Sequence, residues 1–298
     1  MRILLTGASG QVGRELARSL MPLGDIVAPG RADCDLARPQ TLAALVARLA
    51  PDVIVNAAAY TAVDRAEGEE ELATRINAEA VGELAHAAGG VGALLVHYST
   101  DYVFDGAKDG PYREDDAVAP LNAYGRSKLA GERAVAESGC DHLVFRTTWV
   151  YAARGANFLL TMLRLGAERE SLRVVADQIG APTWARNIAD ATALAIAQAR
   201  RERAEGRFAS GLFHLVGGGE TSWHGFAEAI FTLAREKLPE RALRVAEVQA
   251  IASADYPTPA ARPHNSRLDQ QALAARFGLR LPHWQEALAR CIEDLGAR

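Results

Sequence analysis

Lysine and cysteine are both scarce in this sequence. Only three of its 33 basic residues are lysine (Lys108, Lys128 and Lys237), so arginine supplies nearly all the positive charge. A lysine is then informative, because it differs from arginine where a compact ammonium or a shiftable pKa is needed. The three cysteines lie far apart with no CxxC pair. This spacing argues against a disulfide framework and a cysteine metal site, and indicates a reducing compartment.

Long apolar runs and long runs of one charge are also missing. No stretch of about 18 apolar residues is present, so we expect no membrane span. The chain starts with RILLTG, which lacks the features of a signal peptide. A net charge of −4 without a basic run argues against nucleic acid or an anionic membrane as partner. We therefore expect a cytoplasmic protein with a small-molecule substrate.

Short apolar runs alternate with helix-like stretches in the first half of the chain. The 298 residues suffice for one large domain or two ordinary ones. Continuous apolar strands between helices predict an α/β fold, a Rossmann-like doubly wound parallel sheet covered on both faces. The expected strands are 2–6, 25–29, 92–100 and 142–148, with a further strand at 52–59 that runs into a loop. The expected helices are 11–20, 41–50, 69–88 and 123–138.

The pattern loosens after residue 150. Helices are expected at 156–168, 187–204 and 222–238, with a strand and turn at 211–219. The proline-rich segment 256–269 cannot form a regular helix. We expect residues 1–150 to form the dinucleotide-binding domain, with segments near 187–215 returning to it. Residues 151–298 should mainly form a smaller α/β domain that binds substrate.

A glycine-rich turn follows the first expected strand. The stretch GASGQVG places Gly7, Gly10 and Gly13 at the junction of a strand and a helix. Glycine lets the backbone approach a pyrophosphate closely, and a helix start offers free N–H groups. The turn predicts a dinucleotide-phosphate site, the alternative being an ordinary glycine-rich turn.

The end of the second strand should select between NADH and NADPH. NAD-specific enzymes usually carry an acid there, bonded to the ribose 2′-hydroxyl. This sequence has Gly30 and Arg31 at that point, with Asp33 and Asp35 slightly later. Arg31 could bind a 2′-phosphate or lie in solvent, and Asp35 could accept from a free 2′-hydroxyl. We expect both cofactors to be used, with NADPH equal or favoured.

Tyr124 and Lys128 lie one helical turn apart in LNAYGRSKLAGE (121–132), so they share one helix face. Reducing a ketone needs a hydride on carbon and a proton on oxygen. A tyrosine hydroxyl can give that proton, and a nearby ammonium should lower its pKa. Ser99 or Thr100, at the end of a strand, could orient the carbonyl. The alternative is a Tyr–Lys pair on a helix surface.

Longer motifs point to a family. They are VNAAAYTAVD, HYSTDYVFDG, APLNAYGRSKLAGE, FRTTWVYA, DQIGAPT and YPTPAARPHNSRLD. With them the chain closely resembles the dTDP-4-dehydrorhamnose reductases of the extended short-chain dehydrogenase/reductase superfamily, over nearly its whole length. The resemblance implies NADPH- or NADH-dependent reduction of dTDP-4-dehydro-6-deoxy-L-mannose to dTDP-L-rhamnose, the last step in the synthesis of that nucleotide sugar.

The resemblance also implies roles for single residues. The catalytic group would be Thr100, Tyr124 and Lys128. Thr100, Asp101 and Trp149 would contact the sugar nucleotide, although Trp149 could instead pack under the second domain. Arg262 is a candidate for the diphosphate, or a solvated side chain. The cofactor would contact Gly10, Gln11, Val12, Gly13, Asp35, Leu36, Ala59, Tyr60, Thr61, Tyr124 and Lys128. Gly7 and Arg31 are added to this set from the glycine-rich turn and from the end of the second strand.

One feature of the family is not carried over. Some members are described as dimers bridged by Mg2+ through glutamates. Glu15 is present here, but Arg186 and Asn187 stand where a further glutamate would be expected. We therefore assign no metal ligand, and we expect either a monomer or a homodimer.

Two other functions fit parts of the pattern. A nucleotide-sugar epimerase or dehydratase could use the same scaffold, but a dehydratase follows its threonine with Asp-Glu, and here Asp101 is followed by Tyr102. A non-enzymatic NADP-binding regulatory subunit could lose the catalytic residues, and here all three are present. The reductase is the preferred interpretation.

Overall fold

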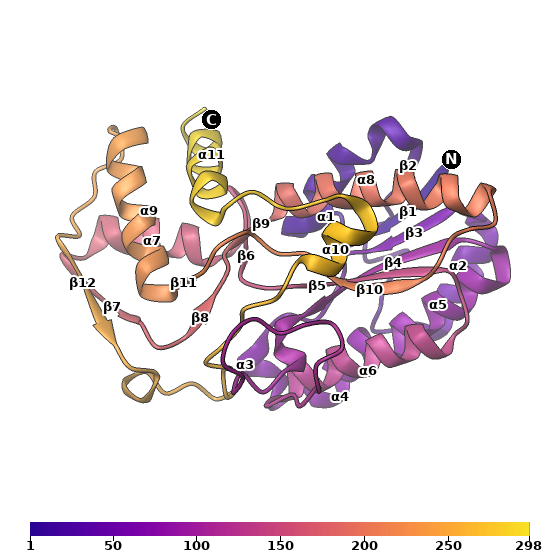
Figure 1. Ribbon diagram of the computed structural model, residues 1–298, viewed down its shortest axis with the longest axis horizontal. Coiled ribbons are helices and arrows are strands. Elements are labelled where there is room, and N and C mark those ends of the chain that lie inside the picture. Colours follow the sequence, from indigo (N-terminus) through magenta and orange to yellow (C-terminus); the bar gives the residue numbers. More distant parts are fainter. Residues whose placement is uncertain (298) are drawn as a thin grey trace.

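A six-stranded parallel sheet forms the centre of one half of the computed structural model, which describes residues 1–297 (Figure 1). The strand order is β10-β5-β4-β3-β1-β2, and all neighbours are parallel. The winding direction reverses between β1 and β3, which opens a crevice at the carboxyl ends of these strands. The predicted Rossmann-like fold is thereby confirmed. The strands are β1 (Arg2–Thr6), β2 (Asp25–Val27), β3 (Val53–Asn56), β4 (Leu94–Thr100), β5 (His142–Thr147) and β10 (Gly211–His214).

Helices cover both faces of this sheet. Side chains of one strand alternate between the faces, so Ile3 and Leu5 enter one core and Leu4 the other. The first core lies under α1 (Gln11–Ser19), α8 (Ala185–Ala204) and α10 (Gln271–Phe277), and the second under α2 (Leu42–Leu49) and α5 (Ala80–Val91). Next to α5 lie α6 (Ala123–Glu137) and a π-helical turn (Arg75–Glu79), and α3 (Val63–Ala66) and α4 (Glu70–Thr74) pack against α6.

A second apolar core lies in the other half, on the left of Figure 1. Three helices enclose it: α7 (Phe158–Glu168), α9 (Trp223–Lys237) and α11 (Trp284–Gly296). Its strands form three pairs, the parallel β7 (Ser171–Val175) with β12 (Glu247–Ile251), the parallel β6 (Val150–Tyr151) with β9 (Thr183–Trp184), and the antiparallel β8 (Ile179–Gly180) with β11 (Thr221–Ser222). The chain crosses between the halves more than once, since α8 and β10 pack in the first half. Arg298, the last residue of the predicted second domain, lies outside the described residues.

Two expected elements show details that their sequence pattern did not specify. The strand expected to run into a loop within 52–59 ends at Asn56, and the next three alanines line a cavity. The helix expected at 69–88 is interrupted by the π-helical turn, which turns Asn77 inward. The Asn77 amide binds both backbone groups of Tyr60 and donates to Ser127 Oγ at 3.0 Å. The hydrogen bonds of the buried Asn77 amide are therefore made at the cost of the regular α-helical pattern at this turn.

A buried ion pair joins β5 to α6. Arg146 donates from Nε to Glu132 Oε1 at 2.8 Å and from Nη2 to Oε2 at 2.7 Å. The side chains are only 4% and 6% exposed, and the guanidinium lies over the ring of Phe104. The bidentate hydrogen bonding between guanidinium and carboxylate offsets the cost of removing both charges from water. Removal of one partner would leave the other charge buried and uncompensated.

We expect Glu132→Gln to lower the free energy of unfolding by about 3–5 kcal/mol, because Arg146 keeps its charge without a carboxylate. Denaturant unfolding measures this change. The matched control is Glu70→Gln, which breaks the exposed pair between Glu70 and Arg126 and should cost less than about 1 kcal/mol. Equal losses in the two variants would contradict the assignment of a buried pair.

Candidate functional site

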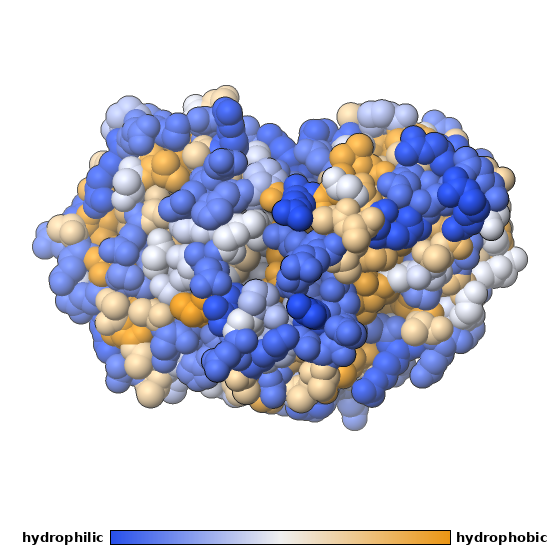
Figure 2. Space-filling view, in the orientation of Figure 1, coloured by the Kyte–Doolittle hydropathy of each residue, from blue (hydrophilic) through white to orange (hydrophobic). Residues whose placement is uncertain are grey.

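A cavity of about 820 Å³ lies where the sheet reverses its winding. Loops after β1, β2 and β3 form its walls, together with residues of β4, β5 and α6. It brings together most of the residues predicted to contact a cofactor: Gly7, Gly10, Gln11, Val12, Arg31, Asp35, Leu36, Ala59, Thr61, Tyr124 and Lys128. Gly13 and Tyr60 lie behind this lining. Figure 2 shows a largely hydrophilic surface with a notch between the two halves.

The glycine-rich turn after β1 fits a pyrophosphate. Gly7 has a φ of +69°, and a Cβ added there would lie 2.6 Å from Ala58 N. A Cβ on Gly13 would lie 2.0 Å from Gly7 O, so the turn and the first helix can approach only as glycines. No side chain of the described residues accepts a capping hydrogen bond from the backbone N–H groups at the start of α1. Its first N–H groups therefore face the cavity side of the turn as donors for an anion.

The two candidate ribose contacts, Arg31 and Asp35, lie beside each other. Arg31 Nε is 3.6 Å from Asp35 Oδ1, and the Arg31 side chain is 80% exposed. Asp35 is partly buried and accepts a hydrogen bond from Ala37 N. Both residues line the cavity, so either a 2′-phosphate or a 2′-hydroxyl bound there would meet a complementary group.

Helix α6 carries Tyr124 and Lys128 to the floor of the cavity. Asn122 caps this helix, and its Oδ1 accepts from Gly125 N at 2.8 Å. Lys128 is only 2% exposed and donates from Nζ to Tyr98 O at 2.6 Å. Its Nζ also lies 3.1 Å from His97 Nε2. The predicted sharing of one helix face is observed, because both side chains line the same cavity.

The pKa of Tyr124 shifts opposite to our expectation. Burial raises it, the charge of Asp101 raises it further, and a hydrogen bond with Thr100 lowers it. Lys128 does not lower it here, since the ammonium is directed to Tyr98 O and His97. Burial lowers the pKa of Lys128 itself to about 8, against an opposing effect of Glu132. Tyr124 is therefore held protonated, as an acid rather than as a preformed phenolate.

Thr100 and Asp101 are buried at the end of β4 and bind each other. Thr100 Oγ1 donates to Asp101 Oδ1 at 3.0 Å and accepts from Tyr102 N. Burial raises the pKa of Asp101 to about 6. Neither residue lines the cavity, although Thr100 reaches Tyr124.

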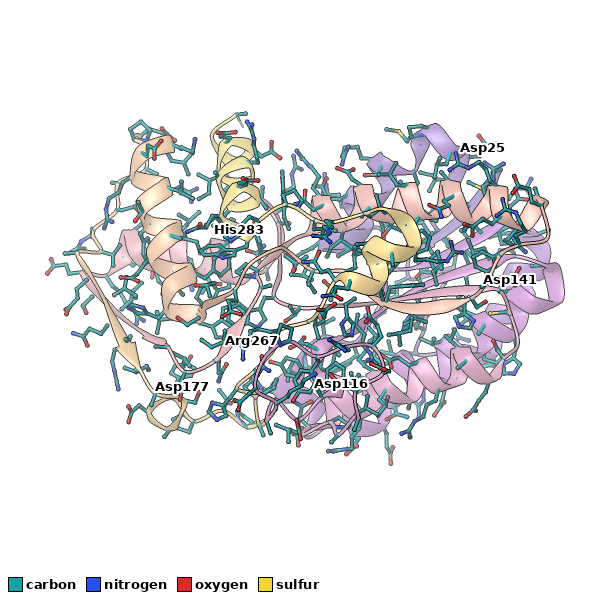
Figure 3. The ribbon with its side chains drawn as sticks, in the orientation of Figure 1. Asp25, Asp116, Asp141, Asp177, Arg267 and His283 are labelled. Atoms are coloured by element: carbon teal, nitrogen blue, oxygen red, sulfur yellow. The ribbon has the colours of Figure 1, made fainter. Side chains whose placement is uncertain are left out.

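Trp149 and Arg262 also lie outside the cavity lining. Trp149 has a φ of +46°, unusual for a non-glycine residue, and stacks on Trp223 with centroids 3.6 Å apart. Arg262 Nη2 donates to Asp64 Oδ2 at 2.8 Å. The neighbouring Arg267, labelled in Figure 3, pairs with Glu220 instead.

Glu15 is paired with arginines. Its Oε2 lies 3.1 Å from Arg186 Nε and 3.3 Å from Arg18 Nε. Arg186 also forms an ion pair with Asp294. In the described part of the chain, no three His, Cys, Asp or Glu side chains group as metal ligands would.

Comparison with known proteins identifies the family. The family described as "RmlD substrate binding domain" matches residues 1–297. The chain belongs to this RmlD family. The curated dTDP-4-dehydrorhamnose reductase of Burkholderia thailandensis is 58% identical over 295 residues, covering 99% of each chain. The enzyme of that name from Escherichia coli K12 is 49% identical, covering 99% of this chain and 98% of its own.

Solved structures of the RmlD family share the fold. A Bacillus anthracis dTDP-4-dehydrorhamnose reductase, in complex with NADP, superposes with a TM-score of 0.88 at 36% identity. The match covers 98% of this chain and 99% of that one. No helix in residues 1–297 of the present chain is long and apolar enough to cross a membrane.

Several cavity residues escaped the sequence analysis. Ile76, Tyr98, Thr147 and Val150 all line the cavity, and none of them was given a role, although all but Ile76 lie within the family motifs HYSTDYVFDG and FRTTWVYA. Three of them lie in or beside strands whose apolar pattern resembles ordinary core. The inward turn of the π-helix brings Ile76 to the cavity. His97, at the start of the motif HYSTDYVFDG, is buried and in polar contact with Lys128.

Proposed function

We propose that this chain reduces dTDP-4-dehydrorhamnose to dTDP-L-rhamnose with NADPH or NADH. The observation that carries this proposal is the shared cavity. It joins a glycine cradle suited to a pyrophosphate with the Tyr124–Lys128 pair, so a dinucleotide in the cradle would extend toward a proton donor. Membership of the RmlD family, and relatives named for this reaction, support the same substrate.

The reaction needs a hydride at the keto carbon and a proton at the keto oxygen. The bound nicotinamide would supply the hydride. Tyr124, held protonated by burial, donates its hydroxyl proton to the oxygen that gains charge. The Lys128 ammonium, which donates to Tyr98 O in this structure, stabilises the resulting phenolate when it turns toward the Tyr124 oxygen. Thr100, already in contact with Tyr124, orients the substrate oxygen when its hydroxyl leaves Asp101.

The substrate side of the site is proposed to come mainly from residues 151–298. Trp149 marks the junction, since it stacks on Trp223 from the start of α9. Asp101, Trp149 and Arg262 are proposed to contact the sugar nucleotide. Arg262 would exchange Asp64 for the diphosphate, because a guanidinium binds both with paired hydrogen bonds.

The setting of the enzyme is part of the proposal. We propose a cytoplasmic monomer or homodimer that binds neither nucleic acid nor membrane. The three buried cysteines fit a reducing compartment. A net charge of −4 fits a small-molecule partner.

Tyr102 argues against a dehydratase. It stands where a dehydratase carries its second acid, and its ring meets that of Tyr124 edge-on at 5.6 Å. The purified protein should therefore oxidise NADPH or NADH in proportion to the dTDP-4-dehydrorhamnose added. Absorbance at the reduced nicotinamide band and identification of the sugar product measure this. Turnover without net loss of reduced cofactor would indicate an epimerase, and binding without turnover a regulatory subunit.

Tyr124→Phe should lower kcat roughly 100-fold or more, because the variant lacks the acid that protonates the keto oxygen. Lys128→Arg should also be impaired, since a guanidinium cannot replace the compact ammonium between Tyr98 O and His97. Steady-state kinetics on folded variants measure both effects. Tyr256→Phe, at a tyrosine that is 60% exposed, is the matched control. Near-native kcat in Tyr124→Phe would refute the assigned acid.

Arg31→Ala should raise KM for NADPH and leave KM for NADH nearly unchanged. Its guanidinium can bind a 2′-phosphate through charge-assisted hydrogen bonds, each worth about 1.5–3 kcal/mol. Asp35 remains to accept from the 2′-hydroxyl of NADH. Arg38→Ala, a nearby arginine outside the cavity lining, is the control. An unchanged KM for NADPH in Arg31→Ala would show that the Arg31 side chain lies in solvent and does not bind the 2′-phosphate.

A further inference from the structure

A chain of four buried polar side chains leads from β1 to the floor of the cavity. Thr6, Asn56, His97 and Lys128 are each at most 2% exposed. Thr6 Oγ1 lies 2.6 Å from Asn56 Oδ1, Asn56 Nδ2 lies 3.1 Å from His97 Nδ1, and His97 Nε2 lies 3.1 Å from Lys128 Nζ. These residues belong to β1, β3, β4 and α6. Such a chain across three neighbouring strands is costly to bury unless every member is bonded.

The protonation state of Lys128 decides which His97 nitrogen carries a proton. An ammonium has only donors, so His97 Nε2 must accept from it. A neutral imidazole then carries its proton on Nδ1. Asn56 must then present Oδ1 to that proton, which is the reverse of the amide orientation in the structure, where Nδ2 faces His97 Nδ1. A half-turn of the amide gives this arrangement, and Thr6 Oγ1 then accepts from Nδ2 in place of donating to Oδ1. In the opposite arrangement Asn56 donates to Nδ1, His97 donates from Nε2, and Lys128 must be an uncharged amine.

The charged groups around His97 favour a neutral ring. Burial and the neighbouring Lys128 both hold the pKa of His97 well below its usual value. Of the titratable side chains around Lys128, Tyr124 and Glu132 lie one turn away on α6 and His97 lies on β4, and the charge of Glu132 acts on Lys128. Glu132 is already bound to Arg146 through both oxygens. His97 is therefore the uncharged acceptor that contacts the ammonium directly.

We propose that His97 is a positioning residue for the reaction. Fixed by Asn56 and Thr6 as the neutral Nδ1–H tautomer, it accepts a hydrogen bond from Lys128 and keeps that side chain cationic beside Tyr124. The consequence for the reaction rests on the proposed reductase function, because it is there that Lys128 stabilises the Tyr124 phenolate. The arrangement of the buried chain itself does not depend on it.

The first test uses the wild-type protein and no substrate. Long-range 1H–15N NMR spectra of 15N-histidine-labelled protein distinguish the two neutral tautomers, and His97→Gln assigns the signal among the seven histidines. Below pH 8 we expect His97 to carry its proton on Nδ1 and to remain neutral. A proton on Nε2, or a cationic ring near pH 7, would overturn the proposal.

The second test exploits the scarcity of lysine. With 13Cε-lysine, the three lysines give separately titratable signals, and Lys108 and Lys237 serve as internal controls. His97→Leu should lower the titration midpoint of Lys128 by about one pH unit or more, since the ammonium loses a charge-assisted hydrogen bond. His97→Gln, which keeps an acceptor, should lie closer to wild type. An unchanged titration midpoint of Lys128 in His97→Leu would overturn the proposal. If that variant does not fold, the tautomer of His97 measured in the wild-type protein decides whether the proposal holds.

The kinetic readout separates this proposal from the reductase proposal. Lys128 is cationic below its titration midpoint and neutral above it. The fall of kcat at alkaline pH should therefore begin at a lower pH in His97→Leu than in wild type. In His97→Gln the fall should lie between the two. A uniform loss of kcat at every pH would indicate a merely structural role and count against the proposal. If the wild type does not reduce the keto sugar, the two NMR measurements still decide the role of His97 toward Lys128.

Discussion

The burial of one ammonium is the constraint on which the site depends. Lys128 sits at the cavity floor, 2% exposed, with Tyr98 O and His97 Nε2 as its partners. Taking an ammonium out of water is expensive unless neighbouring acceptors replace the solvent. The sheet provides these acceptors, since Tyr98 and His97 are consecutive residues of β4. An arginine could not fit this space with its planar fork, which explains why an arginine-rich chain uses lysine here.

The reversal of strand order explains why the cavity lies where it does. Strands β1 and β3 are neighbours in the sheet, but their connections lead away on opposite sides, so nothing fills the space at their carboxyl ends. Gly7 follows β1, the alanines 57–59 follow β3, and neither wall carries a large side chain. The cavity is thus lined by glycine and alanine beside the start of α1, and by Tyr98, Ser99, Tyr124, Lys128 and Thr147 at its other, polar end. That gradient suits a ligand with a phosphate group at one end and a reactive ring at the other.

The first half of the fold could be predicted from sequence because its signals are local. Apolar runs such as RILLT, and the glycines of GASGQVG, specify a strand and a turn within a few residues. The second half could not be predicted as well. Its strands β6, β8, β9 and β11 have two residues each, too few for any period, and α11 emerges only through packing against α9. At the site, the helical spacing of Tyr124 and Lys128 was readable, whereas the raised pKa of Tyr124 and the partner of Lys128 depend on burial by distant residues.

The proline-rich segment 256–269 shows how the two halves act on one site. Its backbone is tied to the start of α6, where Asn122 Nδ2 donates to Ala261 O at 2.8 Å while Asn122 Oδ1 caps the helix. One amide therefore binds both the start of α6 and the segment that carries Arg262. Gly106 allows the same approach, because a Cβ there would lie 2.5 Å from Pro263 Cβ. The prolines keep this segment extended, so its contacts are made along the backbone rather than by a helix face. Segment 256–269 is thus joined through Asn122 to the helix turn that carries Tyr124, by contacts that do not involve the central sheet.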